Sequence, residues 1–347
     1  MTEGVKRRSD IEGKDNSSED KGNYKVVCAG DMVYNSMRMW QGANGISSFD
    51  GIVSPAYTVM TAKQEIANGF FAALFKTHRL ISEFARHSQG MTSDTWNLKY
   101  PQIQTIKTYI PALKEQMKIA DFLVVLDARI EKQVQLVECL KKYKRGVVYK
   151  LLNGTLSFSQ NSVDEVWQRR RLGDFCDVQM CKRIFKEQTS PNGEVPFYKI
   201  GTIGGTPDAY ISRSLYDAYK QKYSFPRKGE FLISCAGTVG KCVLYNGEDS
   251  YYQDSNIVWL RNNSTDVTNE YLYILVSNVD WSTLNSTTIT RIYNDNLRNL
   301  SFNFPPLTTQ EKITSVIFAL ENLISKENRI LEELQQQKLG LLQQLFI

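Results

Sequence analysis

Histidine and cysteine are the residues that most often act as metal ligands and nucleophiles, and this chain does not arrange either of them for that chemistry. Its two histidines, His78 and His87, stand close together with no partner ligand motif around them. The six cysteines form no CxxC pair, and they are Cys28, Cys139, Cys176, Cys181, Cys235 and Cys242. We therefore expect reduced, mostly buried thiols, no disulfide framework and no bound metal.

Two short segments come close to cofactor-binding motifs without completing them. The run from Gly237 to Lys241 would be a phosphate loop only with glycine in place of Cys235 and a hydroxyl residue in place of Cys242. The run Asn303-Phe-Pro-Pro306 holds the residues of an amino-methyltransferase loop in the wrong order, and no glycine-rich turn for a methyl donor precedes it. The sequence therefore predicts neither an active site nor a cofactor.

Composition permits two domains and excludes a membrane protein. A chain of 347 residues can bury two real cores. The formal charge of +5 permits nucleic-acid binding without requiring it. A spanning helix needs about 20 consecutive apolar residues, and no such run occurs. The start, MTEGVKRRSD, lacks the apolar core of a signal peptide. We expect a soluble, cytoplasmic protein.

A long internal repeat decides the architecture that any functional residue must be placed on. Residues Leu113 to Leu152 align without gaps to Leu307 to Phe346, 194 positions later. Identical pairs include Gln116 and Gln310, Ile119 and Ile313, and Leu126 and Leu320. Repetition of this length indicates a tandem of two similar units. Each unit is a globular module followed by one long helix.

Apolar residues in both copies alternate at spacings of four and three, which is a heptad seam. The first copy has Ile119, Leu123, Leu126, Ile130, Val137, Leu140, Val147 and Leu151. The second has Ile313, Ile317, Leu320, Ile324, Leu331, Leu334, Leu341 and Leu345. Polar residues interrupt the seam at equivalent positions, Gln133 and Lys144 in one copy and Glu327 and Lys338 in the other. We expect the helices, roughly 50 Å long, to pair as an antiparallel coiled coil with the modules at opposite ends.

The rest of the chain divides around these helices into strand-rich modules, which gives an α+β fold. Short aromatic and β-branched runs separated by turn residues fill the second module, with helical periodicity at Asn269 to Val276. Phrases of the first module match it, and Gly30 aligns with Gly229. The predicted parts are a first module at 1–110, a helix at 111–152, a polar linker at 153–165, a second module at 166–304 and a helix at 305–347.

Several phrases together resemble the specificity subunit of type I restriction-modification systems. They are Asn35 to Gly42, Gly51 to Tyr57, Trp167 with Leu172-Gly-Asp174, Gly237 to Gly240, and the Leu-x-x-Gln entry into each repeated helix. The resemblance implies two target-recognition domains, each reading half of a split site in double-stranded DNA. It implies helices that fix the spacing and dock methyltransferase (modification) subunits. It also implies an ATP-dependent endonuclease (restriction) subunit as a partner, and no active site in this chain.

Reading a duplex requires side chains that reach base edges and cations that hold phosphates. In the second module the candidates are Lys182, Arg183, Lys199, Arg213, Lys241, Arg291, Tyr293 and Asn294. In the first module they are Arg38, Trp40, Gln41 and Asn44. The types of these residues suit DNA contact, but the same types are common on any protein surface.

The first module is shorter than the second at its start. Trp167 lies 62 residues before Gly229, whereas 29 residues precede Gly30, a difference of 33. We expect an N-terminally incomplete first domain, either from truncation or from rearrangement among specificity genes. The second module should then carry most of the sequence preference, and charge reversal at Arg213 or Lys241 should weaken DNA binding more than reversal at Arg38.

Two other functions fit parts of the pattern. A non-catalytic coiled-coil scaffold could use the two modules to bind protein or carbohydrate, and weak salt dependence of duplex binding would favour it. A stand-alone methyltransferase would require the methyl-donor loop and the Asn-Pro-Pro-aromatic motif that the sequence lacks.

Overall fold

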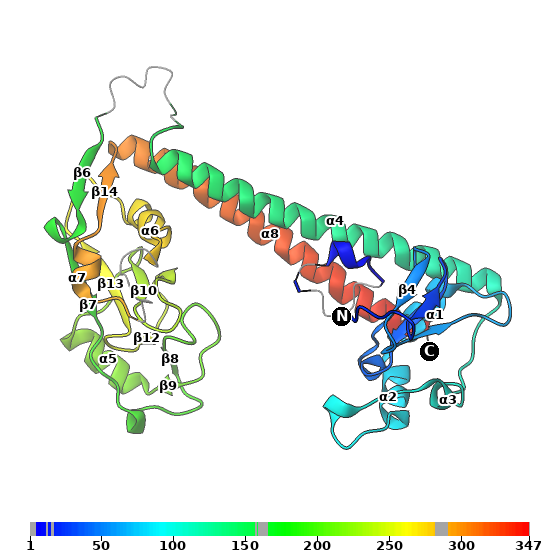
Figure 1. The fold of residues 1–347 in the computed structure, drawn as a ribbon. Coiled ribbons are helices and arrows are strands. Elements are labelled where there is room, and N and C mark those ends of the chain that lie inside the picture. The colour runs from blue at the N-terminus through cyan, green and yellow to red at the C-terminus, as the bar shows by residue number, and fades with distance from the viewer. Residues whose placement is uncertain are drawn as a thin grey trace. The chain divides into compact units, whose positions relative to one another are not determined.

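The computed structural model describes residues 5–11, 13–14, 17–156, 158, 166–281 and 291–346 (Figure 1). Most of the linker predicted at 153–165 lies outside these residues. The chain forms two compact units, and both long helices contribute to each. One unit comprises Met1–Cys139 with Ser325–Ile347, and the other comprises Leu140–Ile324.

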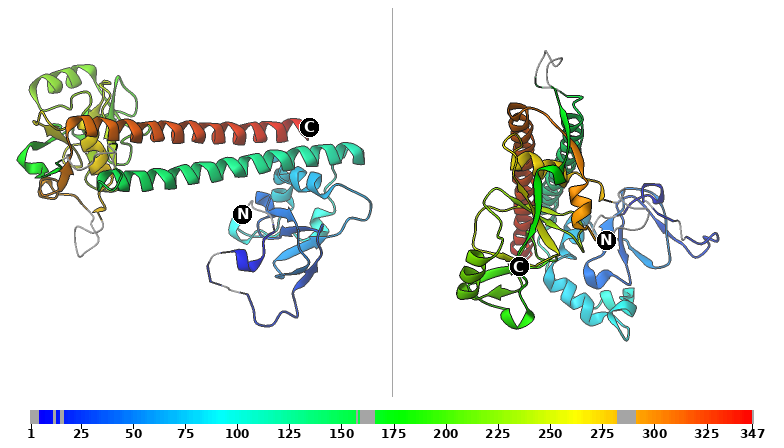
Figure 2. Two further views of the ribbon diagram at one scale, coloured as in Figure 1. Left: turned by 90° about the horizontal axis from the view of Figure 1, so that it is seen from above. Right: turned by 90° about the vertical axis from the view of Figure 1, so that its left-hand side faces the viewer.

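The first unit holds two small antiparallel sheets followed by short helices (Figure 2). Strand β2 lies between β3 and β5, and β1 pairs with β4. The strands are β1 (Lys25–Val27), β2 (Met32–Asn35), β3 (Asn44–Ile46), β4 (Gly51–Val53) and β5 (Tyr57–Met60). The helices are α1 (Asn68–Leu74), α2 (His78–His87), α3 (Tyr100–Ile103) and the first long helix, α4 (Leu113–Leu152).

The second unit has a larger set of strands. Its main sheet has the order β11-β10-β13-β7, and smaller sheets have the orders β12-β8-β9 and β14-β6. The strands are β6 (Gln168–Arg171), β7 (Cys176–Met180), β8 (Val195–Tyr198), β9 (Tyr210–Ile211), β10 (Phe231–Ser234), β11 (Cys242–Leu244), β12 (Tyr251–Tyr252), β13 (Ile257–Asn262) and β14 (Ser301–Phe304). The helices are α5 (Arg213–Lys222), α6 (Asn269–Ser277), α7 (Asn294–Arg298) and α8 (Leu307–Leu345).

The two sheets share a three-stranded pattern. Strand β2 pairs antiparallel with β3 and β5, as β10 does with β11 and β13. A left-handed glycine precedes each central strand: Gly30 has φ +94° and donates to Ser47 O, and Gly229 has φ +89° and donates to Tyr245 O. The alignment of these two glycines is therefore confirmed. In the second unit β13 also pairs with β7, whereas within the described residues β5 pairs only with β2.

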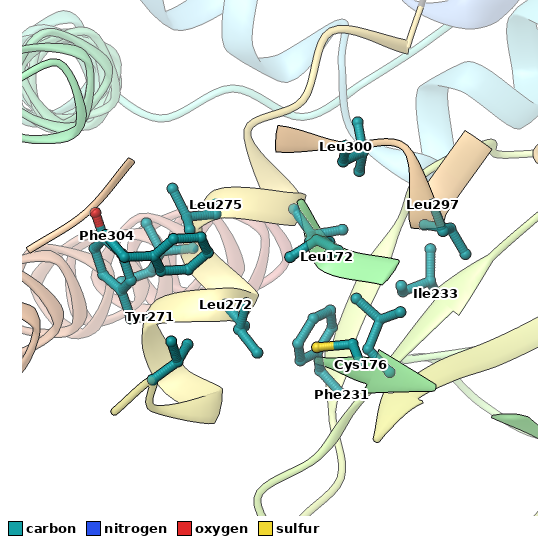
Figure 3. Close-up of a cluster of buried hydrophobic side chains, with 14 of the residues drawn as sticks. Leu172, Cys176, Phe231, Ile233, Tyr271, Leu272, Leu275, Leu297, Leu300 and Phe304 are labelled. Carbon is teal, nitrogen blue, oxygen red and sulfur yellow. The ribbon is translucent and has the colours of Figure 1, made fainter. Parts of the chain in front are cut away.

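The core of the second module combines strands with α6 (Figure 3). Leu172, Phe231 and Leu272 are fully buried in it. The same cluster takes in Val148 and Leu151 from the end of α4, and Ile313 and Ile317 from the start of α8. The module therefore rests on a helix pair formed by the end of one long helix and the start of the other.

The first module is built on its helix pair in the same way. Its core around Phe70 and Leu74 includes Ile119 and Leu123 from the start of α4. Residues near the end of α8 pack against this core, and they are Leu342, Leu345 and Phe346. Leu342 and Leu345 are the repeat equivalents of Val148 and Leu151. The repeat thus encodes the same support under each module, with the two helices exchanging roles.

The polar residues that interrupt the seam make hydrogen bonds or ion pairs with the opposite helix. In the first unit Gln133 Nε2 donates to Glu327 Oε2 at 2.7 Å, and Lys338 forms an ion pair with Asp127. In the second unit Lys144 Nζ lies 2.5 Å from Glu321 Oε1. This pair is the repeat equivalent of Lys338 with Asp127. The pairing order is antiparallel, as predicted, and polar pairs within a seam fix the register of a coiled coil.

Burial varies along the seam. Leu123, Val137, Ile313, Ile317 and Leu334 are buried. Leu126, Ile130, Leu140, Leu320 and Ile324 are only half-buried. Two helices alone cover each other from one side, so full burial on these helices occurs mainly where a module adds a further layer.

A buried glutamine fastens each long helix to its module. Gln310 accepts from the Thr268 amide at 3.0 Å and donates to Asp266 O and Pro305 O, each at 2.8 Å. Gln116 accepts from the Ala67 amide at 3.2 Å and donates to Pro111 O at 2.8 Å. Because Thr268 and Ala67 are the residues immediately before α6 and α1, each glutamine connects equivalent helices. The glutamine of the Leu-x-x-Gln motif at the start of each repeated helix makes these hydrogen bonds, and we call each set a glutamine clasp.

Candidate nucleic-acid interface

An open pocket of about 400 Å³ lies in the second module, between the segment after β7 and the turn before β13. Its lining includes Arg183, Lys186 and Lys199. The turn contributes Gln253, Asp254, Ser255 and Asn256. We call this site the 183–256 pocket. It brings together two cations that the sequence analysis selected, Arg183 and Lys199.

The turn at 253–256 is held from several sides. The Gln253 amide donates to Tyr198 O at 2.9 Å, and the Gln253 side chain accepts from the Ile200 amide at 3.2 Å. The Cys235 amide donates to Asn256 O at 2.7 Å. Neighbouring strands therefore fix the backbone on either side of the turn.

Two arginines complete the hold on this turn. Arg183 Nε donates to Asp254 Oδ2 at 2.9 Å, and Arg291 Nη2 donates to Ser255 O at 3.0 Å. Ser255 has φ +54°, which is the only left-handed non-glycine conformation in the described part of the chain. Such a conformation persists only where its surroundings hold it, and it is typical of functional sites.

Other predicted cations of the second module lie outside the pocket lining. Arg213 Nη1 pairs with Asp249 Oδ2 at 2.5 Å, and Tyr216 donates to the same carboxylate. These two hydrogen bonds lower the pKa of Asp249 to about 2. Lys241 Nζ donates to Ile203 O at 2.6 Å. Their charges are partly committed to contacts within the module.

Of the remaining candidates of this module, Arg291 is half-buried and the others, Lys182, Tyr293 and Asn294, are exposed. Lys182 Nζ lies 5.4 Å from the centroid of the Tyr223 ring, and Arg291 lies 5.9 Å from that of Tyr293. The Tyr293 side chain is 65% exposed, and Asn294 begins α7 beside it. An exposed tyrosine with an adjacent arginine can stack on a base or a sugar, so this position stays a prediction.

In the first module the candidates cluster around a turn after β2. The Trp40 ring packs edge-on against Trp96 with centroids 5.2 Å apart, and its Nε1 donates to Met37 O. Arg38 donates to the same carbonyl, and Gln41 is exposed. Asn44 is buried in β3, where its amide donates to Gly42 O at 3.1 Å. Asn44 is therefore not presented to a ligand in this structure.

The segment that resembles a phosphate loop is a hairpin connection. Residues 237–240 link β10 to β11, and both Gly237 and Gly240 have left-handed φ angles. A Cβ on Gly240 would collide with the Trp281 indole. These glycines serve the turn, and no helix follows to receive a phosphate.

The sequence predicts no bound metal and reduced, mostly buried thiols. No group of three or more potential metal ligands occurs among them. The cysteines are free, and burial raises the pKa of Cys176 and Cys181 to about 12. Thiols of this kind are protonated and unreactive at neutral pH. No helix in the described ranges is long and apolar enough to cross a membrane.

The pocket also contains residues that sequence reasoning missed. Lys186, Gln253 and Asn256 had no motif or spacing to distinguish them. The run QDSN places four polar residues directly before a buried strand. This was the sequence signal that could have identified the turn as a candidate site.

The duplicated fold, in which each module is followed by a long helix, is the architecture that the resemblance to type I specificity subunits predicts. Comparisons with known proteins agree. The family model described as the type I restriction modification DNA specificity domain matches residues 8–138 and 164–336. The chain belongs to this family of non-catalytic specificity subunits with target-recognition domains.

Individual relatives support the same assignment. A putative type I restriction enzyme specificity subunit, S.HindORF215P of Haemophilus influenzae, is 43% identical over 268 residues, which cover 76% of this chain and 67% of the relative. The crystal structure of the type I restriction-modification S subunit from M. genitalium has a TM-score of 0.62 at 14% identity, covering 93% of this chain and 84% of that one. The fold and family expected from the sequence are therefore confirmed, and the scaffold and methyltransferase alternatives are not supported.

Proposed function

We propose that this chain reads a bipartite site in double-stranded DNA, one half with each module, and that its helices dock methyltransferase subunits and an ATP-dependent endonuclease subunit. The observation that carries the proposal is the duplicated support: each module rests on the start of the helix that follows it and the end of the other helix. Two similar modules suit a DNA target that has two half-sites. Family membership supplies DNA as the ligand class.

Helix length is compatible with a split target. Helices α4 and α8 have 40 and 39 residues, which at ~1.5 Å per residue gives about 60 Å each. Half-sites one turn of DNA apart are separated by about 34 Å. The helices are therefore longer than the minimum spacing that two readers on one face of the duplex would need.

We expect the full chain with a cognate methyltransferase subunit to methylate adenine in a split target, and the chain alone to transfer no methyl group and cleave no DNA. We expect no activity from the chain alone because its sequence contains no catalytic motif. Radiolabelled methyl donor and a library of duplexes provide the measurement. Methyl transfer by the purified chain alone would contradict the assignment of catalysis to partner subunits.

We also expect the half-site of the second module to be the sharper one. Its main sheet has β7 beside β13, whereas within the described residues β5 has no such neighbour, and the second module also carries the 183–256 pocket. An open sheet edge is less well ordered and offers fewer fixed contacts. Selection from randomised duplexes should return one well-defined half-site and a weak second one. Two equally sharp half-sites would show that the first module is a complete reader.

A further inference from the structure

The 183–256 pocket has the chemistry of an anion site. Arg183, Lys186 and Lys199 line it, and Asp254 is the carboxylate among the lining residues. The balance of charge around the opening is therefore positive. A phosphodiester carries one negative charge and accepts hydrogen bonds, and it projects from a duplex as a ridge that a concave site can receive.

The cations keep donors available for a ligand. Arg183 uses Nε for Asp254, and in the described part of the chain its two terminal nitrogens have no acceptor. Lys186 has no carboxylate partner among the described residues and is exposed. Lys199 is paired with Asp208 at 2.9 Å, and its side chain remains 40% exposed.

The turn before β13 adds neutral donors to the lining. Asn256 makes backbone hydrogen bonds, but within the described ranges its side-chain amide has no partner. Gln253 uses its carbonyl oxygen for the Ile200 amide, which leaves its NH₂ group pointing away from that bond. Because the turn is fixed by Tyr198, Cys235 and Arg291, the backbone that carries these donors is in place before any ligand arrives.

We propose that the 183–256 pocket binds a backbone phosphate of the half-site that the second module reads. Lys186 and Arg183 supply charge, Asn256 supplies a neutral hydrogen bond, and the contact sets the position of the duplex against the module. This inference rests on the proposed DNA-binding function and adds the class of contact. The pocket positions DNA, and base readout belongs to other residues.

Binding of the full chain to duplexes across a series of salt concentrations tests this assignment. Lys186→Gln should weaken binding to every sequence alike, by roughly fivefold near 0.15 M salt, and should make the slope of log affinity against log salt less negative by about 0.9. Lys228→Gln is the matched control, because Lys228 is an exposed lysine of the same module outside the pocket lining. The control should leave both quantities unchanged.

Asn256→Ala separates a phosphate contact from a base contact. We expect it to weaken binding without changing the preferred half-site or the salt slope. A loss of preference at a single base pair would overturn the phosphate assignment in favour of base reading. A wild-type slope in Lys186→Gln would also overturn it while leaving the proposed function intact. If the wild-type chain itself shows no salt-dependent duplex binding, the proposed function fails together with this inference.

Discussion

Replacement of Ile317 by aspartate should destabilise the second unit by about 3–5 kcal/mol, the usual cost of an uncompensated buried charge. Ile317 is 1% exposed and packs in the cluster that joins α8 to the end of α4 and to α6. The substitution removes apolar packing and places a carboxylate where no cation is available in that cluster. For a unit of this size we expect the melting temperature to fall by roughly 10 °C.

Ala319→Asp provides the control for this variant. Ala319 lies two residues further along the same helix and is exposed. It receives the same charge, and replacing alanine by aspartate costs at most about 0.7 kcal/mol in helix propensity, so its melting temperature should stay within about 2 °C of wild type. Thermal unfolding followed by circular dichroism compares the two variants. Equal melting temperatures would mean that α8 does not pack against the module in solution.

The heptad pattern predicted the helices and their pairing, but it could not rank the seam positions. Leu126 and Leu320 belong to the same apolar seam as Ile317, yet they are half-buried. Ile317 is also covered by the core of the second module, and that contact joins residues far apart in sequence. Aspartate at Leu126 or Leu320 should therefore cost less than at Ile317.

The internal repeat also encoded the ion pairs between the two long helices. Because Lys144 and Lys338 are equivalent, as are Asp127 and Glu321, the sequence held both interhelical ion pairs as a single duplicated pattern. Which lysine meets which carboxylate depends on the antiparallel register, and the seam alone does not give that register. Half-exposed ion pairs of this kind contribute little stability, so their value is in specifying alignment.

Residue types alone could not group the candidate cations into one site, for a similar reason. The residue types led to Arg183, Lys199 and Arg291, which lie at or beside the 183–256 pocket. Arg213 was equally favoured, and it pairs with Asp249 elsewhere in the module. Lys186 and Asn256 were missed, because a surface lysine and a turn asparagine acquire meaning only when folding places them across one cavity. Composition identifies cations, and tertiary structure decides which of them share a site.

Gln310→Leu should be the second severe variant, because this side chain satisfies three backbone groups at once. Gln310 is fully buried, and leucine would leave the Thr268 amide and the carbonyls of Asp266 and Pro305 without these partners. An unsatisfied buried polar group costs about 1–3 kcal/mol, so we expect a total of roughly 3–6 kcal/mol. The loss should appear first as faster amide hydrogen exchange in α6, since the clasp joins α6 to the long helix.

Gln116→Leu tests whether the clasp works in the same way in the first unit. Gln116 makes one accepted and one donated bond, and the accepted bond is longer than its counterpart, so the cost should be smaller, about 2–4 kcal/mol. Gln336→Leu, at an exposed position of α8, should change stability by less than about 0.5 kcal/mol. Urea unfolding of the three variants orders them. If Gln310→Leu unfolds at the same urea concentration as Gln336→Leu, the geometry shared by the two clasps does not stabilise the join between module and helix.

If instead the order is as expected, Gln310→Leu should also weaken the half-site preference of the second module. A module that moves on its supporting helices cannot keep its contacts aligned with the bases.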